Sequence, residues 1–271
     1  MPKGKDSRGS QITRSLAFST TDVLLMTKRN LLRYIRIREL LVFSTIQPVM
    51  FVLLFAFVFG GAITTPGVSY IDYLIPGILI QAVVFGSNQT GVGLAEDLSK
   101  GMIDRFRSLP MARGAVLAGR TLSDTVRNVF VVLLMLGVGG LIGFRFQNGL
   151  PAAVGAIFIA VLFGMAFSWI SAALGLFVKD VEAVQTAGFI WVFPIIFASS
   201  LYVPVETMPE PLRFFAQLNP ITVAVDSVRG LALGAPFSPP IIPALIWGFG
   251  IIAIFMPLSI YRYLRISKEI A

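Results

Sequence analysis

Residues 96–120 read EDLSKGMIDRFRSLPMARGAVLAGR. This stretch, named here the polar segment, is rich in charge, Gly and Pro. It lies between two apolar segments, each of which is long enough to cross a bilayer. A set of membrane spans does not need such a segment for stability. We therefore expect the polar segment to contact a soluble partner.

Long apolar runs make up most of the remaining chain. Hydrophobic residues account for 56% of the 271 residues and charged residues for 13%, whereas a soluble domain carries about 25% charged residues. The runs without a charged residue cover residues 40–71, 73–95, 128–144, 146–178, 183–205 and 231–261. A helical span needs roughly 20 mainly apolar residues. We therefore predict an all-α integral membrane protein with six transmembrane helices, centred near Met50, Gly86, Leu134, Leu162, Trp191 and Ile251.

The distribution of basic residues predicts the orientation. Lys and Arg number 22, and all but Arg145, Arg213 and Arg229 fall on one side of the predicted membrane. In this count, Arg120 and Arg127 belong to the start of the third span. The positive-inside rule then places both termini and the polar segment in the cytoplasm of a cell with a bacterial-type inner membrane. Anionic lipid at the inner leaflet accounts for much of the net charge of +8, so the charge does not call for a nucleic-acid partner.

The predicted domains follow from this topology. Residues 1–39 form a cytoplasmic tail and an interfacial helix, and residues 40–262 form the transmembrane domain. The cytoplasmic loop of that domain is residues 96–120, and its external loop is residues 204–241. Residues 263–271 form a cytoplasmic tail.

Residues 20–39 have the periodicity of an amphipathic helix. Leu24, Leu25, Leu31, Leu32 and Ile35 fall on one helical face, and Arg29, Arg33 and Arg36 fall on another. This pattern predicts a helix that lies at the inner membrane interface and contacts lipid. The alternative is an ordinary cytoplasmic flank whose basic residues only set the topology.

The predicted external segment is rich in proline, with half of the chain's 16 prolines in residues 204–243. Proline breaks regular structure, so we expect short helical pieces near residues 212–218 and 222–233, with Gly234 ending the second. Asp226 and Arg229 are three residues apart there and can form an ion pair. Both pieces are apolar for an external loop, which leaves open whether they lie on the outer leaflet or enter it.

Few polar residues lie inside the predicted spans. The main group is Ser87, Asn88, Gln89 and Thr90 in the second span. Intramembrane polar groups normally face a bundle interior or a cavity, so these residues are candidates for lining a substrate path. Alternatively, they serve only as interhelical hydrogen-bonding partners.

The sequence lacks several residue types and motifs, and their absence excludes some classes of function. The chain has no Cys and no His, which excludes disulfides, thiol nucleophiles and the commonest transition-metal sites. It has no P-loop motif, no acidic residue near the centre of a span and no clustered carboxylates. We therefore expect a transport subunit, not an enzyme, with no metal or cofactor of its own. The alternative is a secondary carrier or channel that works without ATP.

Particular motifs resemble those of the type-2 ATP-binding-cassette (ABC) export permeases, and most closely the daunorubicin-resistance permease family. The sequence GMIDRFRSLPM at residues 101–111 is similar to the loop after the second span in that family. Arg120, GFRF at residues 143–146, NPIT at residues 219–222, Asp226 and RGL at residues 229–231 also fit. The similarity covers nearly the whole chain. The external segment is short, so the chain lacks a large extracellular domain.

This resemblance implies a mechanism for the polar segment. It implies a cytoplasmic coupling helix, two cytoplasmic ABC ATPase subunits that hold ATP and Mg, and a second permease subunit in a homodimer or heterodimer. The implied substrates are drugs, lipids or glycans. The implied coupling residues are Gly101, Asp104, Arg105, Phe106, Arg107 and Pro110, and the matching external residues are Asn219, Pro220, Asp226 and Arg229.

Physical chemistry favours the same role for the coupling residues. Phe106 can anchor in an apolar groove of a partner while the charges around it fix the register. The alternative is a solvated loop that contacts nothing. The predicted function is the transmembrane subunit of an ATP-driven exporter.

Overall fold

The computed structural model describes residues 6–36, 38–61, 63, 65, 67–102, 114–178 and 180–269. Within these ranges the chain is helical and has no strand, as predicted. The elements are α1 (Asp6–Arg36), α2 (Arg38–Leu54), the π-helical turn η1 (Phe55–Phe59), α3 (Tyr70–Ser99), α5 (Ala115–Leu141), α6 (Gly149–Phe177), α7 (Val181–Phe197), the 3-10 turn η2 (Val205–Thr207), α8 (Glu210–Leu218), α9 (Pro220–Leu233) and α10 (Ile241–Glu269).

Four helices in the described part of the chain are long and apolar enough to cross a membrane: α3, α5, α6 and α10. Two further apolar helical stretches, Ile46–Phe59 and Val181–Phe197, are shorter. They match the predicted first and fifth spans in place, but they fall below the roughly 20 residues that a span usually needs. The count of six spans therefore stays a prediction.

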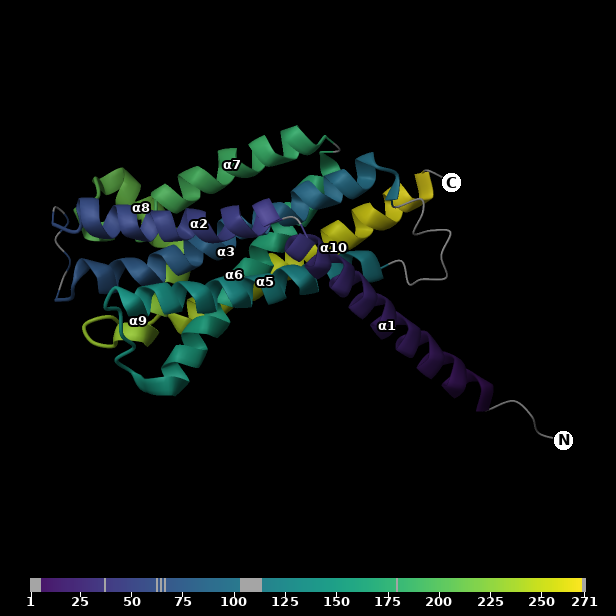
Figure 1. Cartoon of the computed structure of the whole chain (residues 1–271), viewed down its shortest axis with the longest axis horizontal. Helices are drawn as coiled ribbons and strands as arrows, with labels where there is room; N and C mark the ends of the chain where they lie inside the picture. The colour runs from purple at the N-terminus through teal and green to yellow at the C-terminus, as the bar shows by residue number, and fades with distance from the viewer. Residues whose placement is uncertain are drawn as a thin grey trace.

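The helix α3 lies at the centre of the bundle and packs against α2, α5, α6, α7 and α9 (Figure 1). It crosses α6 at very close range, where Gly91 faces Ser171 and Gly175. A Cβ atom on Gly91 would lie 2.3 Å from the carbonyl oxygen of Ser171, and one on Gly175 would lie 2.3 Å from that of Gly91. Small residues at such a crossing let two helices pack backbone to backbone, as is common between membrane helices.

The outer surface of the bundle is apolar. Exposed side chains include Phe57 (73% exposed), Leu141 (88%) and Leu150 (77%), and α10 adds Ile242 (71%) and Ile246 (67%). A soluble monomer rarely exposes such large apolar area, whereas lipid contact accounts for it. The chain is a multi-pass membrane protein.

The two ends of the bundle differ. The start of α1 and the end of α10 lie toward one end, together with the end of α3 and the start of α5, whereas α8 and α9 lie toward the other (Figure 1). The bounds of α8 and α9 agree with the predicted helical pieces, and Gly234, with a φ of 72°, ends α9 as expected.

Two helices begin earlier than the sequence indicated. α1 begins at Asp6, well before the amphipathic pattern of residues 20–39. α5 begins at Ala115, well before the uncharged run that starts at residue 128. Arg127 consequently lies near the middle of α5, because helix formation continues through the charged residues that precede the apolar run; where the third span begins within α5 stays a prediction.

Candidate functional site

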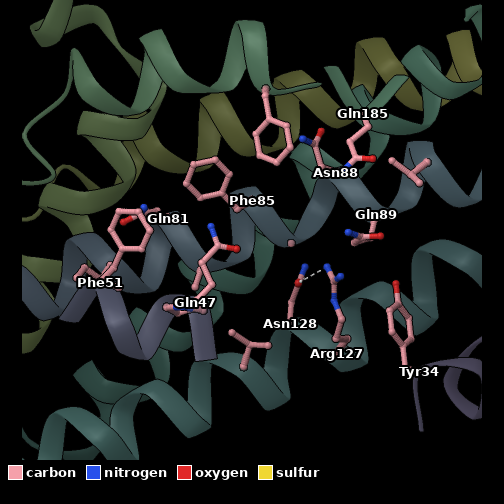
Figure 2. Close-up of a pocket in the computed structure, with 17 residues that line it drawn as sticks. Tyr34, Gln47, Phe51, Gln81, Phe85, Asn88, Gln89, Arg127, Asn128 and Gln185 are labelled. Atoms are coloured by element: carbon pink, nitrogen blue, oxygen red, sulfur yellow. Dashed lines mark hydrogen bonds between the residues drawn. The ribbon is translucent and has the colours of Figure 1, made fainter. Parts of the chain in front are cut away.

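A cavity of about 120 Å³ lies beside α3 and is lined by residues of α2, α3, α5 and α7, with Tyr34 of α1 at the end opposite Phe51 (Figure 2). The amide side chains that line this polar cavity are Gln47, Gln81, Asn88, Gln89, Asn128 and Gln185. Aromatic side chains share its wall: Phe51, Phe85 and Phe189. Amides both donate and accept hydrogen bonds. The polar cavity therefore offers hydrogen bonding and apolar contact side by side.

Arg127 is the cationic residue of the polar cavity and is 5% exposed. Its Nη2 donates to Asn128 Oδ1 (3.1 Å), and its guanidinium carbon lies 5.4 Å from the centre of the Tyr34 ring. Among the described residues, its Nε and Nη1 have no hydrogen-bond partner. Gly86 of α3 makes room for it, because a Cβ atom there would lie 2.8 Å from Nη2.

Asp124, one helical turn before Arg127, is buried and connects three helices. Tyr34 Oη of α1 donates to Oδ1 (2.9 Å), and Thr90 Oγ1 of α3 donates to Oδ2 (2.5 Å). Burial raises the pKa of the Tyr34 hydroxyl to about 12. The hydroxyl therefore stays protonated at neutral pH and remains a donor to Asp124.

The four polar residues singled out in the second span have different roles. Ser87 Oγ donates to Val84 O of its own helix (2.6 Å), and Thr90 binds Asp124 on α5. The carbonyl oxygen of Asn88 accepts from Ser171 Oγ of α6 (3.2 Å). The side chains of Asn88 and Gln89 line the polar cavity. Ser87 and Thr90 thus serve helix structure and packing, Asn88 and Gln89 line a cavity, and the lining of a substrate path stays a prediction.

Sequence reasoning did not single out the remaining polar residues of the cavity: Gln47, Gln81, Arg127, Asn128 and Gln185. They come from separate helices, and nothing in the sequence brings them together. Arg127 carried the one available signal, since it directly adjoins a long uncharged run. An ionisable residue at such a place is a candidate functional residue.

Ion pairs join α1, α3 and α5 at the end of the bundle where the polar segment begins and ends. We name this group the charged junction; its members are Arg29, Arg33, Glu96, Asp97, Lys100 and Arg120. Arg29 Nη2 of α1 lies 2.9 Å and 3.0 Å from the two carboxylate oxygens of Asp97. Arg120 Nη1 of α5 lies 3.5 Å from the same carboxylate. Asp97 is thus shared between α1 and α5.

A second pair reinforces the charged junction. Arg33 donates to Glu96, whose carboxylate also lies 3.6 Å from Lys100 Nζ. Arg120 also donates to the carbonyl oxygen of Gln89 (3.0 Å). A small cavity of about 40 Å³ reaches from Tyr34 and Gln89 to this group. Polar side chains are therefore continuous from the polar cavity to the charged junction.

The two faces of α1 differ, as the amphipathic pattern predicted, but its arginines have another role. Leu24 (62% exposed) and Leu25 (55%) face outward. Met26, Thr27 and Asn30 are buried, and Thr27 Oγ1 donates to the carbonyl oxygen of Gly119 on α5 (3.2 Å).

Arg29 and Arg33 pair with acids of α3, whereas the sequence pattern placed them on a separate face from the leucines and indicated no partner for them. Of the other residues predicted for this helix, Leu31 is half-buried and Arg36 is exposed, and the side chain of Ile35 is outside the described part.

The external residues of the resemblance hold α9 in place. Asn219 caps α9, with its Oδ1 accepting from the backbone N of Ile221 (2.8 Å), and Pro220 is the first residue of the helix. Arg229 is 2% exposed and lies 2.7 Å from Asp226, as the spacing predicted. It also donates to the carbonyl oxygens of Tyr73 and Ser200. These contacts are structural and tie α9 to the start of α3.

The coupling residues of the polar segment fall mostly beyond the described ranges. Gly101 is described and has a φ of 62°. Asp104, Arg105, Phe106, Arg107 and Pro110 lie outside the described residues. In the part of the chain that the structure covers, no group of three or more acidic residues is arranged to hold a metal ion.

Comparison with known proteins decides the family. The family described as ABC-2 type transporter matches residues 21–233. The chain belongs to this family. As an ABC-2 protein it is the transmembrane permease subunit of an ABC exporter and is not itself an enzyme. Membership implies that it works with ATPase subunits, on which nucleotide and Mg act, and with a second permease.

Relatives of this ABC-2 chain include named drug-resistance permeases. A daunorubicin resistance ABC transporter permease protein of Streptomyces coeruleorubidus is 34% identical, over 95% of this chain and 90% of the relative. A probable doxorubicin resistance ABC transporter permease protein of Mycobacterium tuberculosis is 30% identical, over 94% and 92% of the two chains. A putative transport permease of Cyanophora paradoxa is 23% identical, over 84% and 82%.

Proposed function

We propose that this permease crosses a bacterial-type inner membrane six times, with both termini and the polar segment in the cytoplasm. Two cytoplasmic ABC ATPase subunits bind the polar segment, and a second permease, identical or homologous, completes the pathway. ATP binding closes the ATPases and moves the polar segment, and this motion opens the path between the permeases. Amphiphilic drugs, lipids or glycans leave the cytoplasm or the inner leaflet by this path.

The shared carboxylate of Asp97 carries this proposal. Asp97 lies two residues before the end of α3 and contacts Arg120, which lies in the second turn of α5. The polar segment connects these two helix ends. Because Asp97 also binds Arg29, a displacement of the polar segment must move α1, α3 and α5 together. Those helices line the polar cavity, so the charged junction supports a mechanical connection between an ATPase and the substrate path.

The lining of the polar cavity supports an amphiphilic substrate. Amide groups can bind a polar part, and phenylalanine rings can bind an apolar part. Daunorubicin and doxorubicin occur in the names of the relatives, so an amphiphilic drug is one candidate. A membrane lipid is another.

The orientation can be measured because the chain has no Cys. Ser99→Cys, at the end of α3, should react with an impermeant maleimide only after permeabilisation. Glu210→Cys, at the start of α8, should react in sealed cells. Both positions are exposed. Labelling of Ser99→Cys in sealed cells would reverse the proposed orientation.

Transport in inside-out vesicles tests the function itself. Vesicles that contain the permease and its ATPase should accumulate a fluorescent amphiphile when ATP is added, but not with a non-hydrolysable analogue. Vesicles with an ATPase that lacks its catalytic glutamate provide the control. Uphill accumulation by the permease without any ATPase would instead establish an ATP-independent carrier.

A further inference from the structure

We propose that the polar cavity binds the acidic head group of an amphiphile, a carboxylate or a phosphate, and that Arg127 is its cationic partner. This inference rests on the proposed export function and specifies the charge of the substrate. It starts from a cation that is buried inside a membrane span with its hydrogen bonds incomplete.

The position of Arg127 makes its positive charge energetically unfavourable. It lies near the middle of α5, about 10 Å along the helix beyond Arg120, the last residue of the polar segment, at 1.5 Å per residue. A charged side chain at such a depth in a membrane protein is rare, and it normally faces a pathway or a partner. Arg127 does face a cavity, and 95% of its surface is removed from solvent.

The other two buried arginines of the described residues each have a carboxylate partner. Arg120 has the carboxylate of Asp97 at 3.5 Å, and Arg229 has that of Asp226 at 2.7 Å. Arg127 makes no ion pair within the described part of the chain, and its hydrogen-bonded partner is the neutral Asn128. A buried charge without a counter-charge is costly.

Asp124, the nearest acidic residue in the sequence, forms no ion pair with Arg127 within the described part of the chain. Each of its carboxylate oxygens already accepts a hydrogen bond, one from Tyr34 and one from Thr90. Its charge lowers the cost of the cation nearby but leaves Arg127 Nε and Nη1 without acceptors. A guanidinium N–H without an acceptor can donate a charge-assisted hydrogen bond to a carboxylate or a phosphate oxygen.

The surroundings of Arg127 provide both room and further donors. Gly86 lets the guanidinium lie close against α3, since a Cβ atom there would lie 2.8 Å from Nη2, and the room for a ligand is the polar cavity itself. Across the cavity, Gln89 of α3 lies near Arg127 (Figure 2), whereas the amide of Asn88 lies against Gly188 of α7. An anion beside Arg127 would therefore accept from the unpaired N–H groups of its guanidinium and could also contact the amide of Gln89.

The rest of the cavity fits the apolar body of the same ligand. Phe51 and Phe85 line the side away from Tyr34 (Figure 2), and Phe189 also lines the cavity. A volume of about 120 Å³ accommodates a head group and only part of an apolar chain. The remainder can lie along exposed apolar side chains of neighbouring α7, such as Ile190 and Phe193. The positive charge of Arg127 would repel a cationic amphiphile, which should therefore bind less well.

Binding to the purified full-length permease, without any ATPase, tests the inference separately from the export function. The probes are radiolabelled oleate, dioleoyl phosphatidate and oleylamine, measured against the chain in neutral maltoside micelles. Both acids should bind more tightly than the amine. Arg127→Gln should weaken binding of an acid about tenfold or more, because it removes hydrogen bonds between charged groups. Arg145→Gln, the same change at an exposed arginine outside the cavity, should leave binding unchanged.

Two further variants separate charge from folding. Arg127→Lys keeps the charge and should restore part of the affinity. Gly86→Ala keeps Arg127 but places a Cβ atom against Nη2, and it should also weaken binding. Binding of oleate alone or of phosphatidate alone supports the site and identifies the acid it prefers. Equal binding by Arg127→Gln and the parent, or binding of oleylamine as tight as that of oleate, would overturn the inference. ATP-dependent transport in vesicles would survive that result.

Discussion

Removing the charge of Asp97 should destabilise the permease far more than removing that of its neighbour Glu96. Asp97→Asn keeps the shape and one acceptor but leaves Arg29 and Arg120 without their carboxylate. The side chains of Asp97 and Arg120 are each 8% exposed, and that of Arg29 is 32% exposed. Loss of one partner costs about 3–5 kcal/mol in a buried ion pair and about 0–1 kcal/mol in an exposed one. With one buried and one half-exposed partner, Asp97→Asn should cost about 2–4 kcal/mol.

Glu96→Gln is the matched control. Its side chain is 24% exposed, and its partners Arg33 and Lys100 are 32% and 66% exposed. Solvent screens such a pair, so we expect a cost of about 0.5–1 kcal/mol. Each kcal/mol lowers the melting temperature by about 2–4 °C in a domain of 150–250 residues. Thermal unfolding of the purified chain in detergent should therefore show a drop of roughly 4–16 °C for Asp97→Asn and about 1–4 °C for Glu96→Gln. Equal shifts for the two variants would refute the shared role of Asp97.

Three further predictions concern other parts of the bundle. Arg229→Gln leaves Asp226 unpaired and frees two buried carbonyls, and it should lower stability by about 3–5 kcal/mol, measured by thermal unfolding against the exposed Arg213→Gln. Gly91→Leu should separate α3 from α6 and lower stability by at least about 1–3 kcal/mol. Gly250→Leu should not lower stability in this way, because a Cβ atom at Gly250 has open space around it. Fluorescence-detected size exclusion should show aggregation of Gly91→Leu but not of Gly250→Leu. Leu24→Asp with Leu25→Asp should lower the yield of membrane-inserted protein, because α1 loses its exposed apolar face. Unchanged yield would mean that this face does not contact lipid.

The apolar helical segments could be predicted from the sequence, but the polar cavity could not. Uncharged runs marked the apolar segments, and the positions of Pro and Gly gave the bounds of α8 and α9, because these signals are local. The ion pair of Asp226 and Arg229 was also local, since three residues bring two side chains together on a helix.

The missed features depend on how distant helices pack. Arg29 and Asp97 are 68 residues apart, and nothing in the pattern of either helix selects the other as its partner. The cavity role of Arg127 was missed because the sequence did not show that α5 is helical from Ala115 and so carries Arg127 against α3. The packing of α5 on α3 then places Arg120 against Gly93 and Arg127 against Gly86. That register fixes both the charged junction and the cavity, and it follows only from the three-dimensional structure.

The coupling of the polar segment to a separate ATPase is the central claim, and the variant Arg105→Ala with Phe106→Ala tests it most directly. Loss of a buried aromatic anchor commonly costs about 2–4 kcal/mol of binding, a roughly 30- to 1,000-fold loss of affinity. The variant should insert into the membrane like the parent. It should no longer retain the ATPase in pull-down from detergent extracts, or should retain it without ATP-dependent transport in inside-out vesicles. A variant that binds the ATPase and transports as the parent does would show that the polar segment is only a solvated loop.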